Sequence, residues 1–490
     1  MATSKYLAFD FGAESGRAIV GILDGGKISI EEIHRFKNKQ INVFHNYYWN
    51  IFELFEELKT GLKIAVRMGH GDIQSMGVDT WGVDFGLIGE DGQLLELPHS
   101  YRDPRTEGMM EKVFEIIPRD KIYEKTGIQF MELNSLYQLY SMKKMNDKLL
   151  KSAKRLLFMP DLFNYFLTGK MKSEYTIAST SQLMNVNTKQ FEKKIFSKLG
   201  LPYDIMAPII QPGEIIGKLL KKNSEETGIG DADVVAVGCH DTASAVAAVP
   251  AEGENWAYLS SGTWSLIGIE SDKPIINKNY EDDFTNEGGI GNKIRFLRNT
   301  MGMWLIQRLR SAWERDGACF DYVDIANIAS KAEQFKCFIN PDARIFMNPS
   351  NMEEAIDEFC KRTNQECPKD KFGYARTIYE SLALKYKLII KMIEEVSGKK
   401  IEKLHVVSGG AQNEFLNQLT ADATGIPVLA GPIEATALGS ILVQAIAAKK
   451  IESIEHAREI VRRSFDIRIY NPTKTEKWDE MLEKYKSIIA

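Results

Sequence analysis

The sequence lacks several features that define other classes of protein. No apolar run in its 490 residues is long enough to cross a bilayer, and the mean hydropathy of -0.25 is typical of a soluble globular chain. Basic residues are not in excess, since the formal net charge is -5, whereas proteins that bind nucleic-acid polymers carry concentrated Lys and Arg. We therefore expect neither a membrane nor a nucleic acid as a partner, and the sequence identifies no protein partner.

Cysteine is also scarce. The five cysteines include no Cys-x-x-Cys pair, which argues against a zinc site and against a disulfide framework. The first residues lead almost directly into a predicted strand, without the basic segment and apolar run of a secretory signal. These observations predict a cytoplasmic protein whose thiols are mostly reduced and structural.

Familiar nucleotide-binding motifs are absent too. The chain has no Walker A sequence, no Gly-x-Gly-x-x-Gly after a strand and no His-Glu-x-x-His. Asp-Phe-Gly occurs at 10–12 and at 84–86, as in protein kinases. The first copy, however, lies too near the N-terminus to follow an ATP-binding lobe, and no His-Arg-Asp loop is present. The sequence therefore argues against a protein kinase.

The length of the chain predicts two domains, because one hydrophobic core rarely serves so many residues. A break rich in Pro, Gly and acidic residues at 250–254 predicts an N-terminal domain at 1–249 and a C-terminal domain at 250–490. Each half begins with a strand, a tight glycine turn and a second strand, at 6–22 and at 256–270. We expect an α/β fold with one plan repeated in two halves.

The two glycine turns are candidate phosphate sites. Turns crowded with Gly, Ser and Thr bring backbone N–H groups together, and clustered donors hold phosphate oxygens. Residues 13–17 and 260–263 are therefore predicted to grip one triphosphate from two sides. Asp10, where the first strand enters its turn, can direct a carboxylate at a phosphate-bound Mg²⁺. Taken alone, Asp10 is equally compatible with a turn-capping role.

Asp241 is the candidate catalytic residue. It follows an apolar strand and opens a helix of small residues, where a carboxylate can project beyond the carboxyl end of the strand. Phosphoryl transfer to a hydroxyl needs one base that accepts the proton and donors that position the γ-phosphate. His240 and Thr242 flank Asp241 with hydrogen-bonding groups. The alternative is that Asp241 is an ordinary helix N-cap.

Two further segments suggest ligand contacts. A predicted β-hairpin at 77–85 contains Asp79, Trp81 and Asp84, and carboxylates beside an aromatic plane suit a sugar. The alternative is that Trp81 belongs to the core and the carboxylates are cross-strand surface groups.

The small residues at 408–413 would let a flat ligand such as adenine approach the backbone, unless they form a plain strand-to-helix turn.

Taken together, these motifs resemble the FGGY family of carbohydrate kinases. The resemblance covers nearly the whole chain in order and rests on Phe-Asp-Phe-Gly-Ala-Glu-Ser-Gly-Arg (9–17), Gly-Val-Asp-Thr-Trp-Gly-Val-Asp-Phe (77–85), Tyr-Arg-Asp-Pro-Arg-Thr (101–106), Cys-His-Asp-Thr-Ala-Ser-Ala-Val (239–246), Leu-Ser-Ser-Gly-Thr-Trp-Ser-Leu (259–266), Asn-Glu-Gly-Gly (286–289) and Gly-Gly-Ala-Gln-Asn (409–413). It implies two ribonuclease-H-like, actin-like ATPase domains flanking a central cleft. The N-terminal domain would bind sugar and phosphate, and the C-terminal domain the nucleotide.

The resemblance also implies a reaction, in which ATP and L-rhamnulose give ADP and L-rhamnulose 1-phosphate, with Mg²⁺, in L-rhamnose catabolism. Asp241 would be the general base, and Asp10 would face the metal through water. The residues bordering the ketose would be Gly82, His240, Asp241 and Thr242. The residues holding ATP would be Ala13, Glu14, Ser15, Gly16, Arg17, Thr263, Asn299, Gln307 and Gly409. Asn299 and Gln307 enter only through the resemblance.

Two alternatives stay open at this point. One is a kinase of the same architecture for another ketose, such as L-fuculose or xylulose, because individual hydrogen bonds read hydroxyl stereochemistry. The other is a nucleotide-dependent assembly or chaperone-like protein of the actin superfold, because a fold does not by itself set the function. In either kinase, we expect the domains to close when the sugar binds.

Overall fold

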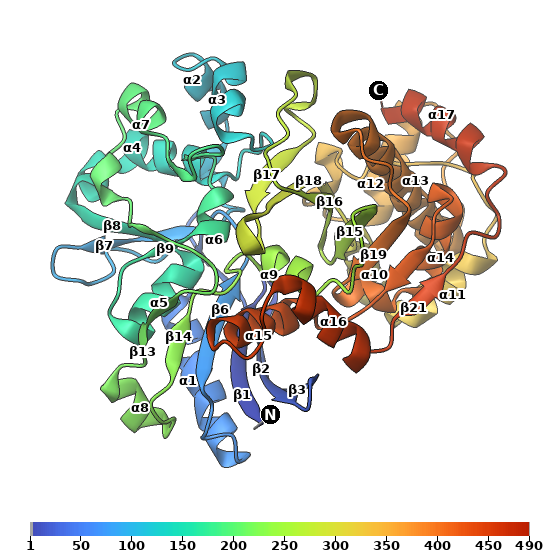
Figure 1. Ribbon diagram of the computed structural model, residues 1–490. Coiled ribbons are helices and arrows are strands. Elements are labelled where there is room, and N and C mark those ends of the chain that lie inside the picture. Colours follow the sequence, from blue (N-terminus) through green and yellow to red (C-terminus); the bar gives the residue numbers. More distant parts are fainter. Residues whose placement is uncertain (1–2, 490) are drawn as a thin grey trace. The chain divides into compact units, whose positions relative to one another are not determined.

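The computed structural model describes residues 3–489, which fold into two compact units (Figure 1). Each unit is assembled from stretches that are separate in the sequence. Unit 1 comprises the residues up to Ala248 together with Glu270–Phe296 and Ala435–Ser464. Unit 2 comprises Val249–Ile269, Leu297–Glu434 and the residues from Phe465 onward. The domain limits at 1–249 and 250–490 stay a prediction.

Unit 1 contains a six-stranded sheet with the order β13–β14–β6–β1–β2–β3. Its strands are β1 (Ser4–Phe11), β2 (Ser15–Asp24), β3 (Lys27–Lys37), β6 (Ser75–Thr80), β13 (Ile215–Lys218) and β14 (Asp233–Val235). The first three strands form an antiparallel meander, and β6 joins β1 in parallel. The predicted strand-turn-strand at the start of the chain is therefore confirmed.

Helices cover both faces of this sheet. On one face, α1 (Ile51–Arg67) approaches so closely that a Cβ at Gly61 would lie 2.9 Å from atoms of Phe9 and Ala18. On the other face, α15 (Ala435–Ala447) contacts β1 and β6, and Gln444 accepts a hydrogen bond from Ser75 (2.8 Å). Figure 1 shows α15 beside α9 (Asp241–Ala247), and a Cβ at Gly439 would lie 1.7 Å from the Ser244 carbonyl oxygen. Unit 1 is thus completed by a helix from late in the sequence.

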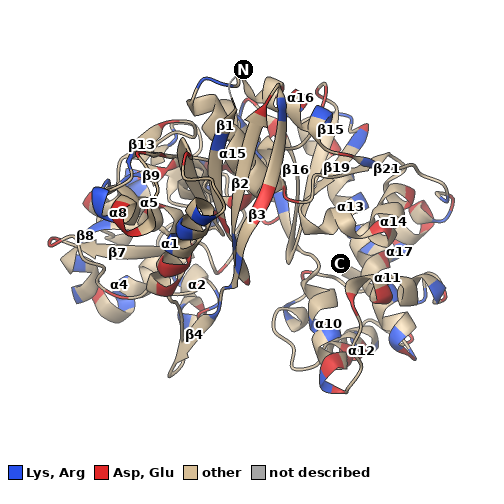
Figure 2. Ribbon diagram, turned by 90° about the horizontal axis from the view of Figure 1, so that it is seen from below, with Lys and Arg blue, Asp and Glu red and all other residues tan. Residues whose placement is uncertain are grey.

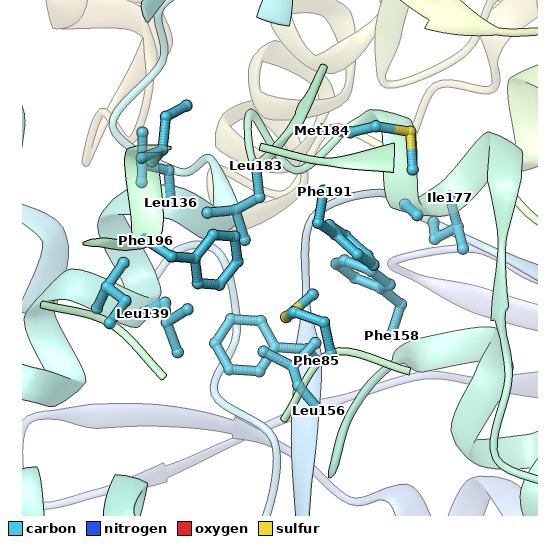
Figure 3. Close-up of a cluster of buried hydrophobic side chains, with 14 of the residues drawn as sticks. Phe85, Leu136, Leu139, Leu156, Phe158, Ile177, Leu183, Met184, Phe191 and Phe196 are labelled. Carbon is cyan, nitrogen blue, oxygen red and sulfur yellow. The ribbon is translucent and has the colours of Figure 1, made fainter. Parts of the chain in front are cut away.

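Unit 1 also contains a hydrophobic cluster around β7 (Phe85–Gly89), α4 (Ser135–Ser152) and β8 (Ala153–Phe158), part of which is drawn in Figure 3. It includes Phe85, Leu136, Leu139, Phe158 and Phe196, all buried. The remaining elements of unit 1 are β4 (Gln40–Val43), β5 (Asn46–Trp49), α2 (Met109–Phe114), α3 (Arg119–Thr126), α5 (Met159–Thr168), β9 (Ser173–Glu174), α6 (Tyr175–Ser179), β10 (Met184–Asn185), β11 (Gln190–Phe191), α7 (Lys193–Leu199), β12 (Ile209–Ile210), α8 (Lys221–Thr227), β17 (Thr285–Gly288) and α16 (Ile454–Ser464).

The prediction of a β-hairpin at 77–85 is wrong. Strand β6 pairs with β1 and β14, whereas β7 pairs with β8 in a separate sheet. The chain turns away between the two strands, where Val83 has a positive φ of 68°. Because both edges of β6 are already occupied, β7 cannot fold back onto it.

Unit 2 repeats the plan of unit 1. Its sheet has the order β17–β18–β16–β15–β19–β20–β21, in which β17 is an added edge strand. Among the other six strands, β15 again lies between the second strand, β16, and a parallel fourth, β19. The strands are β15 (Trp256–Ser261), β16 (Trp264–Ser271), β18 (Ile294–Met301), β19 (Lys403–Val407), β20 (Val428–Ala430) and β21 (Arg468–Tyr470). The helices are α10 (Trp304–Arg315), α11 (Tyr322–Lys331), α12 (Met352–Arg362), α13 (Lys371–Ser397), α14 (Glu414–Thr424) and α17 (Trp478–Ile489).

Many of the helices carry mixed charge, whereas the buried helix α15 carries none. Figure 2 shows basic and acidic residues interspersed along them, for example on α1 and α8. Within residues 3–489, none of the helices combines the length and the apolar character that a membrane crossing needs.

Candidate active site

The first glycine turn holds Asp10 in a buried ion pair. Asp10 lies near the end of β1 with 4% of its surface exposed, and the antiparallel register places Arg17 of β2 opposite it. The Arg17 guanidinium forms a salt bridge with the Asp10 carboxylate. Burial raises the pKa of Asp10, the Arg17 charge lowers it and the Asp241 charge raises it, with a net upward shift. Within the turn, the Gly12 N–H donates to the Ser15 carbonyl oxygen at 2.9 Å.

Asp79 is the neighbour of Asp10 on the parallel strand β6. It is fully buried, and neither carboxylate oxygen has a hydrogen-bond partner among the described residues. Burial, followed by the charges of Asp10 and Asp241, raises the pKa of Asp79 well above its usual range. Three carboxylates, those of Asp10, Asp79 and Asp241, therefore influence one another electrostatically.

These carboxylates are suitable ligands for a hard cation. Within residues 3–489, no group of three or more His, Cys, Asp or Glu side chains is arranged to hold a metal ion. Mg²⁺ does not need such a cage, because it is commonly bound by one or two carboxylates, water and substrate phosphates. The residues present therefore fit Mg²⁺, while the assignment of Asp10 to it stays a prediction.

Asp241 is the first residue of α9, directly after the apolar segment that runs beside β6. Its Oδ1 accepts hydrogen bonds from the Thr242 backbone N–H (2.5 Å) and from the Thr242 hydroxyl (3.0 Å). Among the described residues no hydrogen bond reaches Oδ2, and one third of the side chain is exposed (33%). One carboxylate oxygen is thus held in place and the other is open to a proton donor.

A buried acid fixes the turn that leads to Asp241. The Cys239 N–H donates to Glu174 Oε2 (3.3 Å), and the His240 N–H donates to the Thr176 hydroxyl (3.1 Å), which itself donates to Glu174 (2.6 Å). Burial raises the pKa of Glu174 to about 7, although the hydrogen bonds from Thr176, Ile177 and Cys239 lower it. Sequence reasoning missed Glu174 and Thr176. The available signal was weak: an acid at the N-cap of the short helix α6.

Gly82 and His240, both predicted to border the sugar, lie together. A Cβ placed on Gly82 would lie 3.5 Å from His240 Nε2 and 3.4 Å from the Thr180 hydroxyl. The same His240 nitrogen is 3.4 Å from Asp241 Oδ1. The structure therefore brings Gly82, His240, Asp241 and Thr242 together, as the sequence predicted, while their contact with a sugar stays a prediction.

A buried ion pair lies behind His240. Arg295 is fully buried, and its Nη2 lies 3.0 Å from Glu287 Oε2 and 3.0 Å from His240 Nδ1. Glu287 Oε2 is 3.1 Å from the same ring nitrogen. Sequence reasoning missed both residues, although Glu287 belongs to the Asn-Glu-Gly-Gly motif at 286–289, to which it gave no role.

Trp81 and Asp84 are part of the protein core. Trp81 is 6% exposed, with its ring centroid 4.2 Å from that of Trp49. Asp84 accepts hydrogen bonds from four donors: Trp49 Nε1 (2.7 Å), Trp81 Nε1 (2.9 Å), the Tyr101 N–H (3.0 Å) and Gln138 Nε2 (2.9 Å). Burial raises the pKa of Asp84 to about 6, and these donors lower it. Of the two alternatives left open by the sequence, the structure favours the one that assigns Trp81 to the core, but Asp84 is buried and hydrogen-bonded to Trp81 and is not a cross-strand surface group.

In unit 2, the predicted nucleotide residues gather at one end of the sheet. The Thr263 hydroxyl donates to Gln307 Oε1 (3.4 Å), and the Thr263 carbonyl accepts from the Gly302 N–H (3.1 Å), shortly after Asn299 on β18. On the neighbouring strand end, a Cβ on Gly409 would meet nothing within 4 Å. Thr263, Gln307 and Gly409 thus surround open backbone without a carboxylate among them.

Family comparisons identify both halves of the chain. Residues 5–248 match the N-terminal domain, and residues 257–448 the C-terminal domain, of the FGGY family of carbohydrate kinases. The chain belongs to this family, and it is a phosphotransferase with an α/β, two-domain actin-like ATPase fold. Membership implies ATP as the phosphoryl donor and a divalent metal. The alternative of an assembly or chaperone-like protein is not favoured by these matches.

Individual relatives agree with the family assignment. The chain is 44% identical to the rhamnulokinase of Bacteroides thetaiotaomicron, covering 99% of each chain, and 41% identical to that of Bacillus subtilis, covering 96% of each. Among solved structures, it is similar to the gluconate kinase of Lactobacillus acidophilus, with a TM-score of 0.83 at 16% identity over 99% of this chain and 98% of that one. A xylulose kinase from the same organism gives a TM-score of 0.82 at 16% identity, covering 99% and 97%. The solved structures support the fold alone.

Proposed function

We propose that this carbohydrate kinase transfers the γ-phosphoryl group of ATP to the primary hydroxyl of L-rhamnulose, giving L-rhamnulose 1-phosphate and ADP. The choice of sugar is supported by the full-length relatives that are named rhamnulokinase. The observation that carries the mechanism is Asp241, with Oδ1 tied to Thr242 and Oδ2 open, beside His240 and Gly82. A cytoplasmic location is part of the same proposal.

Asp241 acts as the general base. Its Oδ2 accepts the proton of the sugar hydroxyl while the hydroxyl oxygen forms a bond to the γ-phosphorus, and the bond to the bridging oxygen of ADP breaks. Positioning accounts for most of the effect, because this chemistry asks little else of the protein. Thr242 holds the carboxylate in the orientation that leaves Oδ2 toward the hydroxyl.

The phosphate and nucleotide groups are divided between the two repeated turns. Residues 13–17 hold the phosphates, and Thr263, Asn299, Gln307 and Gly409 hold the nucleotide. Asp10 would hold Mg²⁺, and the bound metal would offset the negative charge of the phosphates. Because transfer requires both sets of groups to reach one triphosphate, the proposal includes closure of the domains when sugar binds. Small-angle scattering should record compaction with L-rhamnulose and a non-hydrolysable ATP analogue, and an unchanged radius of gyration would remove that part.

The direct test compares sugars and one isosteric variant. L-Rhamnulose, L-fuculose and xylulose are assayed for sugar-dependent ADP release, and phosphorus NMR identifies the phosphorylated oxygen. We expect the highest kcat/KM with L-rhamnulose and phosphate on its primary hydroxyl. Asp241→Asn should lower kcat by roughly 10²–10⁴-fold, the usual effect of losing a general base, with sugar KM little changed.

The matched control is Asp231→Asn, because Asp231 is an exposed aspartate of the same unit (78%). It should leave kcat and KM unchanged. Retained turnover in D241N would disprove the role of Asp241, and a higher kcat/KM for another ketose would disprove the choice of sugar.

A further inference from the structure

The buried Glu287–Arg295 pair has no place in the mechanism above, yet it contacts the histidine next to the base. We infer that Glu287 and Arg295 are positioning residues that hold His240 as a neutral ring protonated on Nε2, so that this N–H faces the sugar beside Asp241. The inference rests on the proposed function, because His240 borders the sugar only in that proposal.

The contact with Arg295 determines which ring nitrogen carries the proton. A guanidinium has only N–H donors, so His240 Nδ1 must be the acceptor in its 3.0 Å hydrogen bond with Arg295 Nη2. A ring nitrogen that accepts has no proton, and the single proton of the neutral ring then lies on Nε2. The orientation of Arg295 is itself fixed, because its Nε donates to the Gly288 carbonyl oxygen at 2.8 Å.

Glu287 offers the competing arrangement. Its Oε2 lies 3.1 Å from Nδ1, and a proton on Nδ1 would donate to this carboxylate instead. Among the described residues, however, the hydrogen-bond geometry is met between Arg295 Nη2 and Nδ1 and not at Oε2. Burial raises the pKa of Glu287, but Oε2 is close enough to Arg295 and His240 for both to lower this pKa, with a net shift below its usual range. Glu287 is therefore the counter-charge that lets Arg295 lie fully buried beside a neutral ring.

The segment that carries Glu287 is rigidly placed. The Gly288 N–H donates to the Ser179 hydroxyl at 2.7 Å. A Cβ on Gly288 would lie 2.6 Å from the Tyr175 ring, so β17 is packed closely against α6. Helix α6 also provides Thr176, which accepts from the His240 backbone N–H at 3.1 Å. Both the backbone and the ring of His240 are thus held from the same side.

The opposite edge of the ring faces the predicted chemistry. Nε2 is 3.4 Å from Asp241 Oδ1 and 3.5 Å from the Cβ position of Gly82. An N–H at this point attracts Oδ1 and offers a donor to a sugar oxygen near the reacting hydroxyl. An unprotonated Nε2 would instead set a lone pair against the carboxylate. The ion pair therefore determines whether this edge donates or accepts.

Histidine NMR of the wild-type chain tests the inference without any substrate. The chain has seven histidines, and His240→Gln identifies the His240 signals in long-range ¹H–¹⁵N spectra of ¹⁵N-histidine-labelled protein. We expect His240 to show a protonated Nε2 and an unprotonated Nδ1. A protonated Nδ1, or an average of the two tautomers, would overturn the inference. Because sugar turnover plays no part in this measurement, its result is separable from the failure of the proposed function.

A double variant tests the consequence for the sugar. Removing one partner would leave a buried charge, whereas Glu287→Met with Arg295→Met replaces the pair by apolar side chains, a change that is often tolerated. We expect His240 to become a mixture of tautomers and the sugar KM to rise roughly five- to tenfold, the effect of losing one hydrogen bond. The ATP KM should stay within about twofold, since the nucleotide residues are untouched. A variant in which the His240 tautomer and sugar KM are unchanged would contradict the positioning role.

The matched control is another buried ion pair, Arg376–Glu380 on α13, with 2.6 Å between Nε and Oε1. Arg376→Met with Glu380→Met makes the same chemical change and should leave the His240 signals and the sugar KM as in the wild type. An equal rise of the sugar KM in this control would attribute the effect to general loss of stability. If the first double variant does not fold, the wild-type NMR result still decides the inference.

Discussion

The hairpins β1–β2 and β15–β16 occupy the same position in two sheets of the same strand order, yet they carry different chemistry. In unit 1, Asp10 is paired in register with Asp79 of the parallel strand β6, and Asp10 forms a salt bridge with Arg17. In unit 2, Ser260 is paired in register with Val407, and its hydroxyl lies 3.4 Å from that of Ser408. The backbone provides two equivalent turns, and the side chains make one acidic and the other neutral.

This difference is compatible with the proposed division, in which the first turn serves the metal and the second turn serves the nucleotide. A carboxylate cluster suits a cation and a proton, whereas hydroxyls and open glycine backbone suit the neutral and anionic parts of a nucleotide. The proposed base Asp241 follows β14, the strand that pairs with β6. At the corresponding point of unit 2, β20 is followed by Gly431 and Pro432, and Glu434 stands directly before α15. Both strands are thus followed by an acid near the start of a helix, and the acid of unit 1 interacts electrostatically with Asp10 and Asp79.

Among variants that compare the two turns, the largest effect should come from removing the acidic character of the first turn. Asp10→Asn should lower kcat/KM roughly 10–100-fold, the usual cost of losing an outer-sphere partner of a metal, and raise the Mg²⁺ concentration needed for half-maximal rate. The equivalent change in unit 2, Ser260→Ala, should cost only about two- to fivefold and leave the Mg²⁺ requirement unchanged. Steady-state kinetics over a Mg²⁺ series measures both. Equal effects of the two variants would contradict the division described above.

The next-largest effect is expected on the free energy of unfolding, because glycines at both turns are closely packed. A Cβ on Gly16 would lie 2.2 Å from the Phe36 ring, and one on Gly410 would lie 2.0 Å from Ser261 Oγ. Gly16→Ala and Gly410→Ala should each lower the free energy of unfolding by roughly 1–3 kcal/mol, because a well-packed site must shift to admit a methyl group. Urea denaturation measures the change. Gly409→Ala, which meets nothing within 4 Å, is the control and should unfold as the wild type does.

The next prediction concerns the buried acid Glu174, which should make the stability of unit 1 depend on pH. Burial raises the folded-state pKa of Glu174 to about 7, above roughly 4.3 in an unfolded chain. Its contribution to stability is therefore complete below about pH 4.3 and is lost as the pH rises through about 7. Because Glu174→Gln lacks this dependence, its stability relative to the wild type should increase by roughly 2 kcal/mol between pH 5 and pH 8.

Free energies of unfolding in urea at the two pH values measure this difference. Glu90→Gln, at a largely exposed glutamate (75%), is the control and should stay parallel to the wild type. Parallel pH curves for E174Q and the wild type would show that Glu174 does not titrate in this range.

The smallest effect is expected from the neutral turn itself. Thr263→Val removes a hydroxyl that donates to Gln307 at 3.4 Å while preserving the shape of the side chain. The ATP KM should rise by only about two- to fivefold, as for one lost hydrogen bond, with the sugar KM unchanged. A change in the sugar KM would contradict the assignment of this turn to the nucleotide.

Local patterns predicted the parts of the candidate site that lie near strand ends and helix starts. Asp10 is the last residue but one of β1, Thr263 lies in the turn after β15 and Asp241 opens α9. The repeated hairpins are confirmed for the same reason, since strand, glycine turn and strand are adjacent in the sequence.

Residues brought in from distant segments were beyond such reasoning. Glu174 and Glu287 reach the turn at His240 from separate elements, and no local pattern distinguishes them from other acids. The prediction of a hairpin at 77–85 was wrong for a related reason, because the strands that pair with β6 come from elsewhere in the chain. The sequence left the role of Trp81 open, because a tryptophan next to a strand suits a core as well as a sugar-binding plane. Only the position of Trp49 decides between these two roles.

The late helix α15 has a consequence for biosynthesis. Gln444 donates to the Leu7 carbonyl oxygen (3.0 Å) and accepts from Ser75, so the first sheet is incomplete until residues 435–447 have been translated. Unit 1 can reach its final packing only after residues 435–447 have left the ribosome. A nascent chain arrested before residue 435 should therefore expose the face of β1 and β6 that α15 covers, even though every residue of the loop at Asp241 has already been made.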